Sequence, residues 1–168
     1  IRTHATPPTV SAAAVTATDS KTESVTLSFA LSSPGLLHYE VVKAGSAGAK
    51  DGESLKGASV SGNVVATGSI TVSDTKADEY VVTGLTAGTA YDVYVVSETA
   101  DSGGVFGAIS DRMSVSTHAV APKLASVDAS ASGGATDSVT LSFALSSPGL
   151  LHYEVVKAGS AGAKDGES

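Results

Sequence analysis

Four histidines are the side chains of this sequence best suited to metal binding or to proton transfer near neutral pH. They are His4, His38, His118 and His152. None falls in an HxxxH or HExxH spacing, which would bring two imidazoles to one metal ion. We therefore expect histidines of strands and joints, with a metal ligand as the alternative.

Carboxylates are the second group with chemical potential, because calcium binds oxygen ligands that converge from one loop. The acidic residues are scattered instead, at Asp51 and Glu53, Asp74 to Glu79, Asp101 and Asp111. No EF-hand or glycine-rich calcium repeat is present. We expect loop carboxylates that keep the surface soluble and no cofactor, with calcium at a repeat junction as the alternative.

The chain contains a long internal repeat. Residues 24–54 and 138–168 are identical, and the two copies begin at Ser24 and Ser138, 114 residues apart. At the same offset, residues 3–5 match 117–119 and Pro8 matches Pro122. A period of this length is that of a whole small domain. We expect residues 1–5 to end one repeat, 6–119 to form a complete repeat, and 120–168 to supply about three strands of the next.

The repeat also bears on catalysis, since an active site would be duplicated with each domain. No GxSxG, P-loop or dinucleotide-binding fingerprint occurs. We therefore expect that the protein is not an enzyme.

The composition limits the partners. The net charge is −7, the pI is about 4.9 and only 16% of residues are charged, which argues against binding to nucleic acid or to an anionic membrane surface. No apolar run is long enough to insert into a membrane. The absence of cysteine excludes disulfides and thiolate metal sites.

Alternating apolar residues predict the elements that would position these side chains. Val25, Leu27, Phe29 and Leu31 alternate with small polar residues, a period of two that indicates a strand. The expected strands are 9–18, 24–31, 37–43, one or two within 64–72 broken by Gly68, 79–83, 91–96 and one within 108–118. A helical turn is expected within 51–58. Seven short strands indicate a two-sheet β-sandwich.

Strand alternation also predicts a candidate contact face. If Tyr91, Val93 and Val95 point into the core, Tyr94 and Val96 point outward. His38, Glu40 and Val42 on the neighbouring strand would share that outer face. An apolar stripe that recurs in each repeat is a candidate contact surface, unless the glycine-rich segment 44–62 of the same domain covers it.

Residues 80–95, YVVTGLTAGTAYDVYV, resemble the E–F region of fibronectin type III domains. The resemblance implies a tyrosine corner formed by Leu85, Gly88 and Tyr91, with the Tyr91 hydroxyl bonded to backbone near Leu85. It also implies an all-β fold of tandem fibronectin type III-like, or related Ig-like, β-sandwiches. The sequence departs from the family in carrying Phe29 where a Trp is usual, and it lacks an RGD tripeptide.

Residues 35–42 and 87–95 are similar to type III-like repeats of long microbial and algal surface proteins: adhesins, cell-wall proteins and mastigoneme-type fibres. This resemblance implies a non-catalytic structural repeat of an extracellular, cell-surface protein or filament, whose partners are neighbouring repeats and copies of itself. A calcium-stiffened or ligand-presenting stalk module of an adhesin is the alternative. Turn and joint prolines would also be hydroxylation and O-glycosylation sites in such a protein; they are Pro7, Pro8, Pro34 and Pro148.

Overall fold

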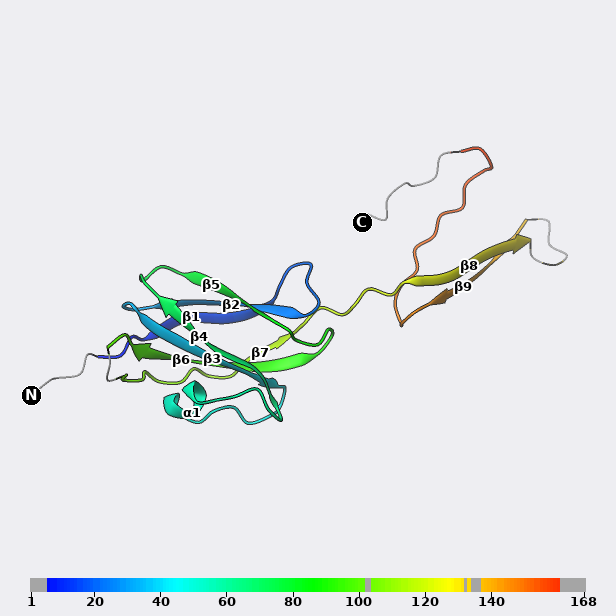
Figure 1. Ribbon diagram of the computed structural model, residues 1–168. Helices are drawn as coiled ribbons and strands as arrows, with labels where there is room; N and C mark the ends of the chain where they lie inside the picture. The colour runs from blue at the N-terminus through cyan, green and yellow to red at the C-terminus, as the bar shows by residue number, and fades with distance from the viewer. Residues whose placement is uncertain (1–5, 102–103, 132, 134–136, 161–168) are drawn as a thin grey trace, which may run out of the picture. The chain divides into compact units, whose positions relative to one another are not determined.

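The computed structural model describes residues 6–101, 104–131, 133 and 137–160 (Figure 1). These residues form antiparallel β-sheets with one short helix among them, so the chain is all-β. The chain divides into two compact units, Ile1–Val120 and Ala121–Ser168.

The first unit contains two sheets. Strands β1 (Val10–Ala17), β2 (Ser24–Leu31) and β5 (Asp78–Thr83) form one sheet in the order β1-β2-β5. Strands β3 (Gly35–Lys43), β4 (Val64–Val72), β6 (Ala90–Thr99) and β7 (Met113–Ser116) form the other in the order β4-β3-β6-β7. The helix α1 (Gly52–Lys56) lies in the connection between β3 and β4.

One apolar core joins the two sheets, because alternate residues of each strand point to it. Phe29 of β2, Val41 of β3 and Val93 of β6 are each at most 1% exposed. The buried cluster comprises Val25, Leu27, Phe29, Leu31, Leu37, Tyr39, Val41, Val72, Val82, Leu85, Tyr91, Val93 and Val95.

Gly68 does not break the fourth strand, because β4 continues through it from Val64 to Val72. Gly68 lies opposite Tyr39 in the ladder with β3, and a Cβ at Gly68 would lie 2.7 Å from the Tyr39 hydroxyl. The missing side chain therefore makes room for the Tyr39 ring.

The second unit contains a hairpin of β8 (Leu124–Ala131) and β9 (Val139–Leu145). Leu124 pairs with Leu145, as Val10 pairs with Leu31 in the first unit, so the hairpin has the register of β1–β2. The expectation of a third strand is wrong for the described residues, because 149–157 do not form one. In the first unit, β3 is bonded on both sides, by β4 and β6; the described part of the second unit has no strand after β9.

Candidate functional site

The candidate contact face is the outer face of β3 and β6, and of the two alternatives that the sequence left open, exposed or covered by residues 44–62, the structure has the covered one. His38 is 2% exposed, and Val42 and Val96 are 0% exposed. Tyr94 is half-buried. These four residues do lie on neighbouring strands, since His38 pairs with Val96 and β3 is bonded to β6 along its length. The face is thus an interior surface of the first unit, not an open one.

Residues 44–62, which we call the strap, cover this face (Figure 1). At its centre is α1, whose N-cap Asp51 accepts a hydrogen bond from Ser54 N at 2.8 Å. Leu55 of α1 is 1% exposed. Gly48 lies against the Tyr94 ring, and a Cβ there would collide with it. The strap is rich in small residues, a composition typical of loops. Their small size allows the strap to lie close to the sheet.

A polar cluster fastens α1 to the sheet. Glu98 of β6 accepts hydrogen bonds from His38 Nε2 at 2.5 Å and from Lys56 Nζ at 2.6 Å. The His38 Nδ1 atom lies 2.5 Å from Ser69 Oγ on β4. The Phe106 ring lies 6.0 Å from the His38 ring, and the Lys56 ammonium lies 5.6 Å from the Phe106 centroid. Burial acts to raise the pKa of Glu98, but the bonds from Lys56 and His38 outweigh it and hold this pKa below its usual value.

A second buried carboxylate, Asp92 of β6, bonds the start of the strap. Its Oδ2 accepts a hydrogen bond from Gly45 N at 2.8 Å, and its Oδ1 accepts one from Ser114 Oγ at 2.6 Å. Arg112 Nη1 lies 4.0 Å from Oδ2. The hydrogen bond from Ser114 lowers the pKa of Asp92, and burial raises it. The hydrogen bond from Gly45 and the charge of Arg112 lower this pKa further, so that it lies below its usual value.

Ser69, His38 and Glu98 place a hydroxyl, an imidazole and a carboxylate in series. The same series activates the serine nucleophile of many hydrolases. Here the carboxylate is shared with the Lys56 ammonium. A carboxylate already paired with a cation stabilises a developing imidazolium less. The arrangement thus fits a structural tie between β3, β4, β6 and α1.

The hydrogen bond that the resemblance implies for the tyrosine corner is present at Tyr91. The Tyr91 hydroxyl accepts a hydrogen bond from Thr86 N at 2.9 Å, and Tyr91 is 3% exposed. Leu85 is buried beside it. Gly88 has a φ of +60°, which favours glycine, and its N–H donates to His118 O at 2.9 Å. The corner joins the β5–β6 connection to the chain that follows β7.

The candidate glycosylation prolines differ in accessibility. Pro8 is fully buried, and its carbonyl accepts a hydrogen bond from Ser97 Oγ, so it is not an accessible attachment site. Pro7 is half-buried, whereas Pro34 and Pro148 are exposed.

The other candidate ligands are not brought together. His118 and His152 are exposed, and His4 lies outside the described residues. Among the described residues, no three His, Asp or Glu side chains are grouped so as to hold a metal ion.

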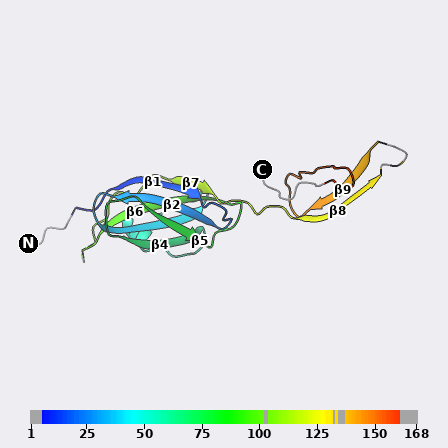
Figure 2. The same cartoon turned by 90° about the horizontal axis from the view of Figure 1, so that it is seen from above.

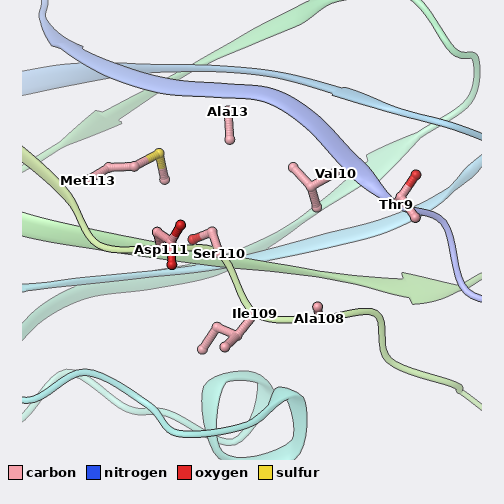
Figure 3. A pocket seen from close by; sticks show the side chains of 8 residues that line it. All are labelled: Thr9, Val10, Ala13, Ala108, Ile109, Ser110, Asp111 and Met113. Atoms are coloured by element: carbon pink, nitrogen blue, oxygen red, sulfur yellow. The ribbon is translucent and has the colours of Figure 1, made fainter.

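A groove of about 510 Å³ opens between β1 and the segment that leads into β7 (Figure 3). Val10 and Ala13 of β1 face Ser110, Asp111 and Met113 across it. Strands β1 and β7 lie along the same side of the unit (Figure 2). The groove is the seam between sheet edges that are not hydrogen-bonded to each other, and its mixed lining selects no ligand class.

Sequence reasoning missed Asp92, Glu98 and Lys56 as site residues. One signal was present: Asp92 and Glu98 have the same parity on β6 as Tyr94 and Val96, so alternation places them on the same outer face. Nothing in the sequence pairs them with the strap, because that pairing is long-range.

No protein-family model matches this chain, and no match was found among curated proteins. Within the described ranges, the structure contains no helix of the length and apolarity needed to cross a bilayer.

Proposed function

We propose that the chain is a structural, non-catalytic segment of a long extracellular surface protein or filament, built from tandem domains. Repetition carries this proposal. The β8–β9 hairpin reproduces the register of β1–β2, 114 residues later. A chain that builds the same domain again gains length and adds no new chemistry. The extracellular location rests on the resemblance to repeats of surface proteins.

We further propose that the first unit is a fibronectin type III-like β-sandwich. The strand orders β1-β2-β5 and β4-β3-β6-β7, with a core between the sheets, support this fold. The Tyr91 hydrogen bond to Thr86 N supports it independently, because it pins the connection that crosses from one sheet to the other.

The strap changes how the domains would assemble. Since Val42 and Val96 are buried beneath it, they offer no surface for packing between chains. We therefore propose that the domains act in series along the chain, and that any lateral packing in a fibre uses other surfaces.

Electron microscopy of the native full-length protein tests this function. The expected result is a linear array of similar domains outside the cell. Isolated globular particles, or an intracellular location, would contradict it. A melting temperature of the purified protein that rises strongly with calcium would favour the stalk module of an adhesin instead.

A hydrolysis assay tests the absence of catalysis at Ser69, His38 and Glu98, whose arrangement resembles a catalytic one. We expect the chain to release p-nitrophenol from p-nitrophenyl acetate at the same rate as the Ser69→Ala variant. An acetyl group found on Ser69 by mass spectrometry, and lost in His38→Ala, would contradict the structural role of this cluster.

A further inference from the structure

The buried carboxylates of the first unit are all on one side of one sheet. Among the described residues, the buried acidic side chains are Glu40, Asp92 and Glu98, at 4%, 2% and 3% exposure. They lie on the outer face of β3 and β6, whereas the core between the sheets contains no carboxylate. The strap side of the sheet is therefore held by carboxylate hydrogen bonds in addition to apolar contacts, whereas no carboxylate takes part in the core between the sheets.

Each of these carboxylates accepts a hydrogen bond from the strap. Asp92 Oδ2 accepts from Gly45 N at 2.8 Å, and Glu40 Oε2 accepts from Ala49 N at 2.6 Å. Glu98 Oε1 accepts from Lys56 Nζ at 2.6 Å. The attachment points are spread from one end of the strap to α1. A carboxylate accepts such bonds strongly while it is ionised and weakly once it is protonated.

We propose that the strap is an acid-releasable cover of the four-stranded sheet. Protonation of the carboxylates beneath it detaches residues 44–62 and exposes Val42 and Val96, while the core between the sheets stays folded. This proposal concerns the first unit alone and goes beyond its structural role in an array.

The charged groups around each carboxylate are consistent with release in acid. Glu98 faces His38 from β3 and Lys56 from α1, and a cavity beside it is also lined by Glu53 and Asp101. Protonation of Glu98 removes the negative charge that the Lys56 ammonium binds.

The other two carboxylates have fewer charged neighbours. Asp92 faces Arg112, at 4.0 Å, and is otherwise held by neutral donors. Glu40 lies between Thr67 of β4 and Tyr94 of β6 in the ladders of β3. Protonation of Asp92 weakens its bond to Gly45 N.

The pKa directions set the pH at which release begins. The pKa values of Asp92 and Glu98 are lowered from 3.8 and 4.5. A group with a lowered pKa in the folded state contributes stability above its ordinary value, and this contribution is lost as the pH falls through the lower one. The strap is therefore closed at neutral pH and opens in acid below those ordinary values.

Cysteine labelling tests this directly, because the chain has no cysteine of its own. Val42→Cys places a thiol beneath the strap, and Val82→Cys, also buried, places one in the core between the sheets. Each variant is labelled with 4,4′-dithiodipyridine, which reacts in acid, at pH 7 and at pH 3, and the rates are normalised to a model thiol. We expect the Val42→Cys rate to rise about ten-fold or more in acid, equivalent to about 1.4 kcal/mol of opening, with little change for Val82→Cys.

Two outcomes would overturn the proposal. Equal acceleration at both positions would mean that acid unfolds the whole unit, and protection of Val42→Cys at both pH values would mean that the strap stays closed. Asp92→Asn with Glu98→Gln should make Val42→Cys reactive already at pH 7; an unchanged pH response in that variant would also exclude the mechanism.

A steric variant tests opening without changing a charge. Gly48→Val should lift the strap from Tyr94 and accelerate labelling of Val42→Cys at pH 7, while Val82→Cys stays protected. Ala47→Val, at an exposed neighbour in the same strap, is the matched control and should leave both rates unchanged.

Discussion

Strand β3 and residues 149–157 have the same sequence and different structures. In the first unit, Tyr39 and Val41 are 6% and 0% exposed in a strand bonded on both sides. Their counterparts Tyr153 and Val155 are 74% and 71% exposed and belong to no strand. The identical composition and alternation of the two segments cannot account for this difference. It teaches that this pattern needs long-range partners before it becomes a strand.

The preceding hairpin behaves differently. Strands β8 and β9 pair in the register of β1 and β2, although Phe143 is 50% exposed where Phe29 is 1% exposed. The two strands of a hairpin are neighbours in sequence, so the entropy of closing the loop between them is small. Pairing of the hairpin is thus local, whereas burial of its apolar face is not.

Pairing with copies of β4 and β6 should remove the difference. In an engineered chain that repeats residues 55–120 after Ser168, we expect 149–157 to form a strand, because copies of β4 and β6 become available. Hydrogen exchange of these amides should slow by about a hundred-fold or more. Unchanged exchange would contradict the role of the partners; the same extension with a scrambled sequence is the control.

Matched truncations of the two phenylalanines should show the energetic side of the comparison. Phe29→Ala removes a fully buried ring and should lower the free energy of unfolding of the first unit by about 3–5 kcal/mol. Phe143→Ala, in the same sequence context, should change the urea denaturation of that unit by less than about 0.5 kcal/mol. A similar loss of unfolding free energy of the first unit in both variants would contradict the difference in burial between Phe29 and Phe143.

The tyrosine corner lies at the connection between β5 and β6 of the first unit. Tyr91→Phe removes the hydroxyl that accepts from Thr86 N and keeps the ring. We expect the first unit to lose about 1 kcal/mol in urea denaturation, with unchanged hydrogen exchange in β8 and β9. A loss below about 0.3 kcal/mol would mean that water replaces the hydroxyl without cost.

The smallest expected effect is spectroscopic. Burial, followed by the hydrogen bond and charge of Tyr80, raises the pKa of Tyr39 from 10.0 to about 12. A raised pKa contributes stability below pH 10 that is lost as the pH rises toward 12. In a tyrosinate titration at 295 nm, Tyr39→Phe should remove the step near pH 12, whereas Tyr153→Phe, its matched control, should retain that step. If the step near pH 12 remains in Tyr39→Phe, it belongs to another tyrosine.

Sequence reasoning predicted the strands well where they pair with near neighbours or alternate clearly. The predicted bounds of 24–31 match β2, and the predicted hydrogen bond of the Tyr91 hydroxyl near Leu85 is present at Thr86. It also placed His38, Val42, Tyr94 and Val96 on one face of neighbouring strands. It left open whether that face was exposed, because a run of Gly, Ala and Ser gives no sign of what it covers.

By itself, the sequence determined the period of the repeat and the alternation that gives each strand a buried side, whereas the glycine and tyrosine of the corner were implied by the resemblance. The alternation is a local property, fixed by the geometry of the pleated backbone. Only the tertiary structure decided that the strap closes over three carboxylates and that one of two identical segments becomes a strand. Both depend on hydrogen-bond partners distant in sequence: Asp92 for Gly45, and β4 and β6 for β3. A backbone or carboxylate can be buried only where such partners replace the water that it loses.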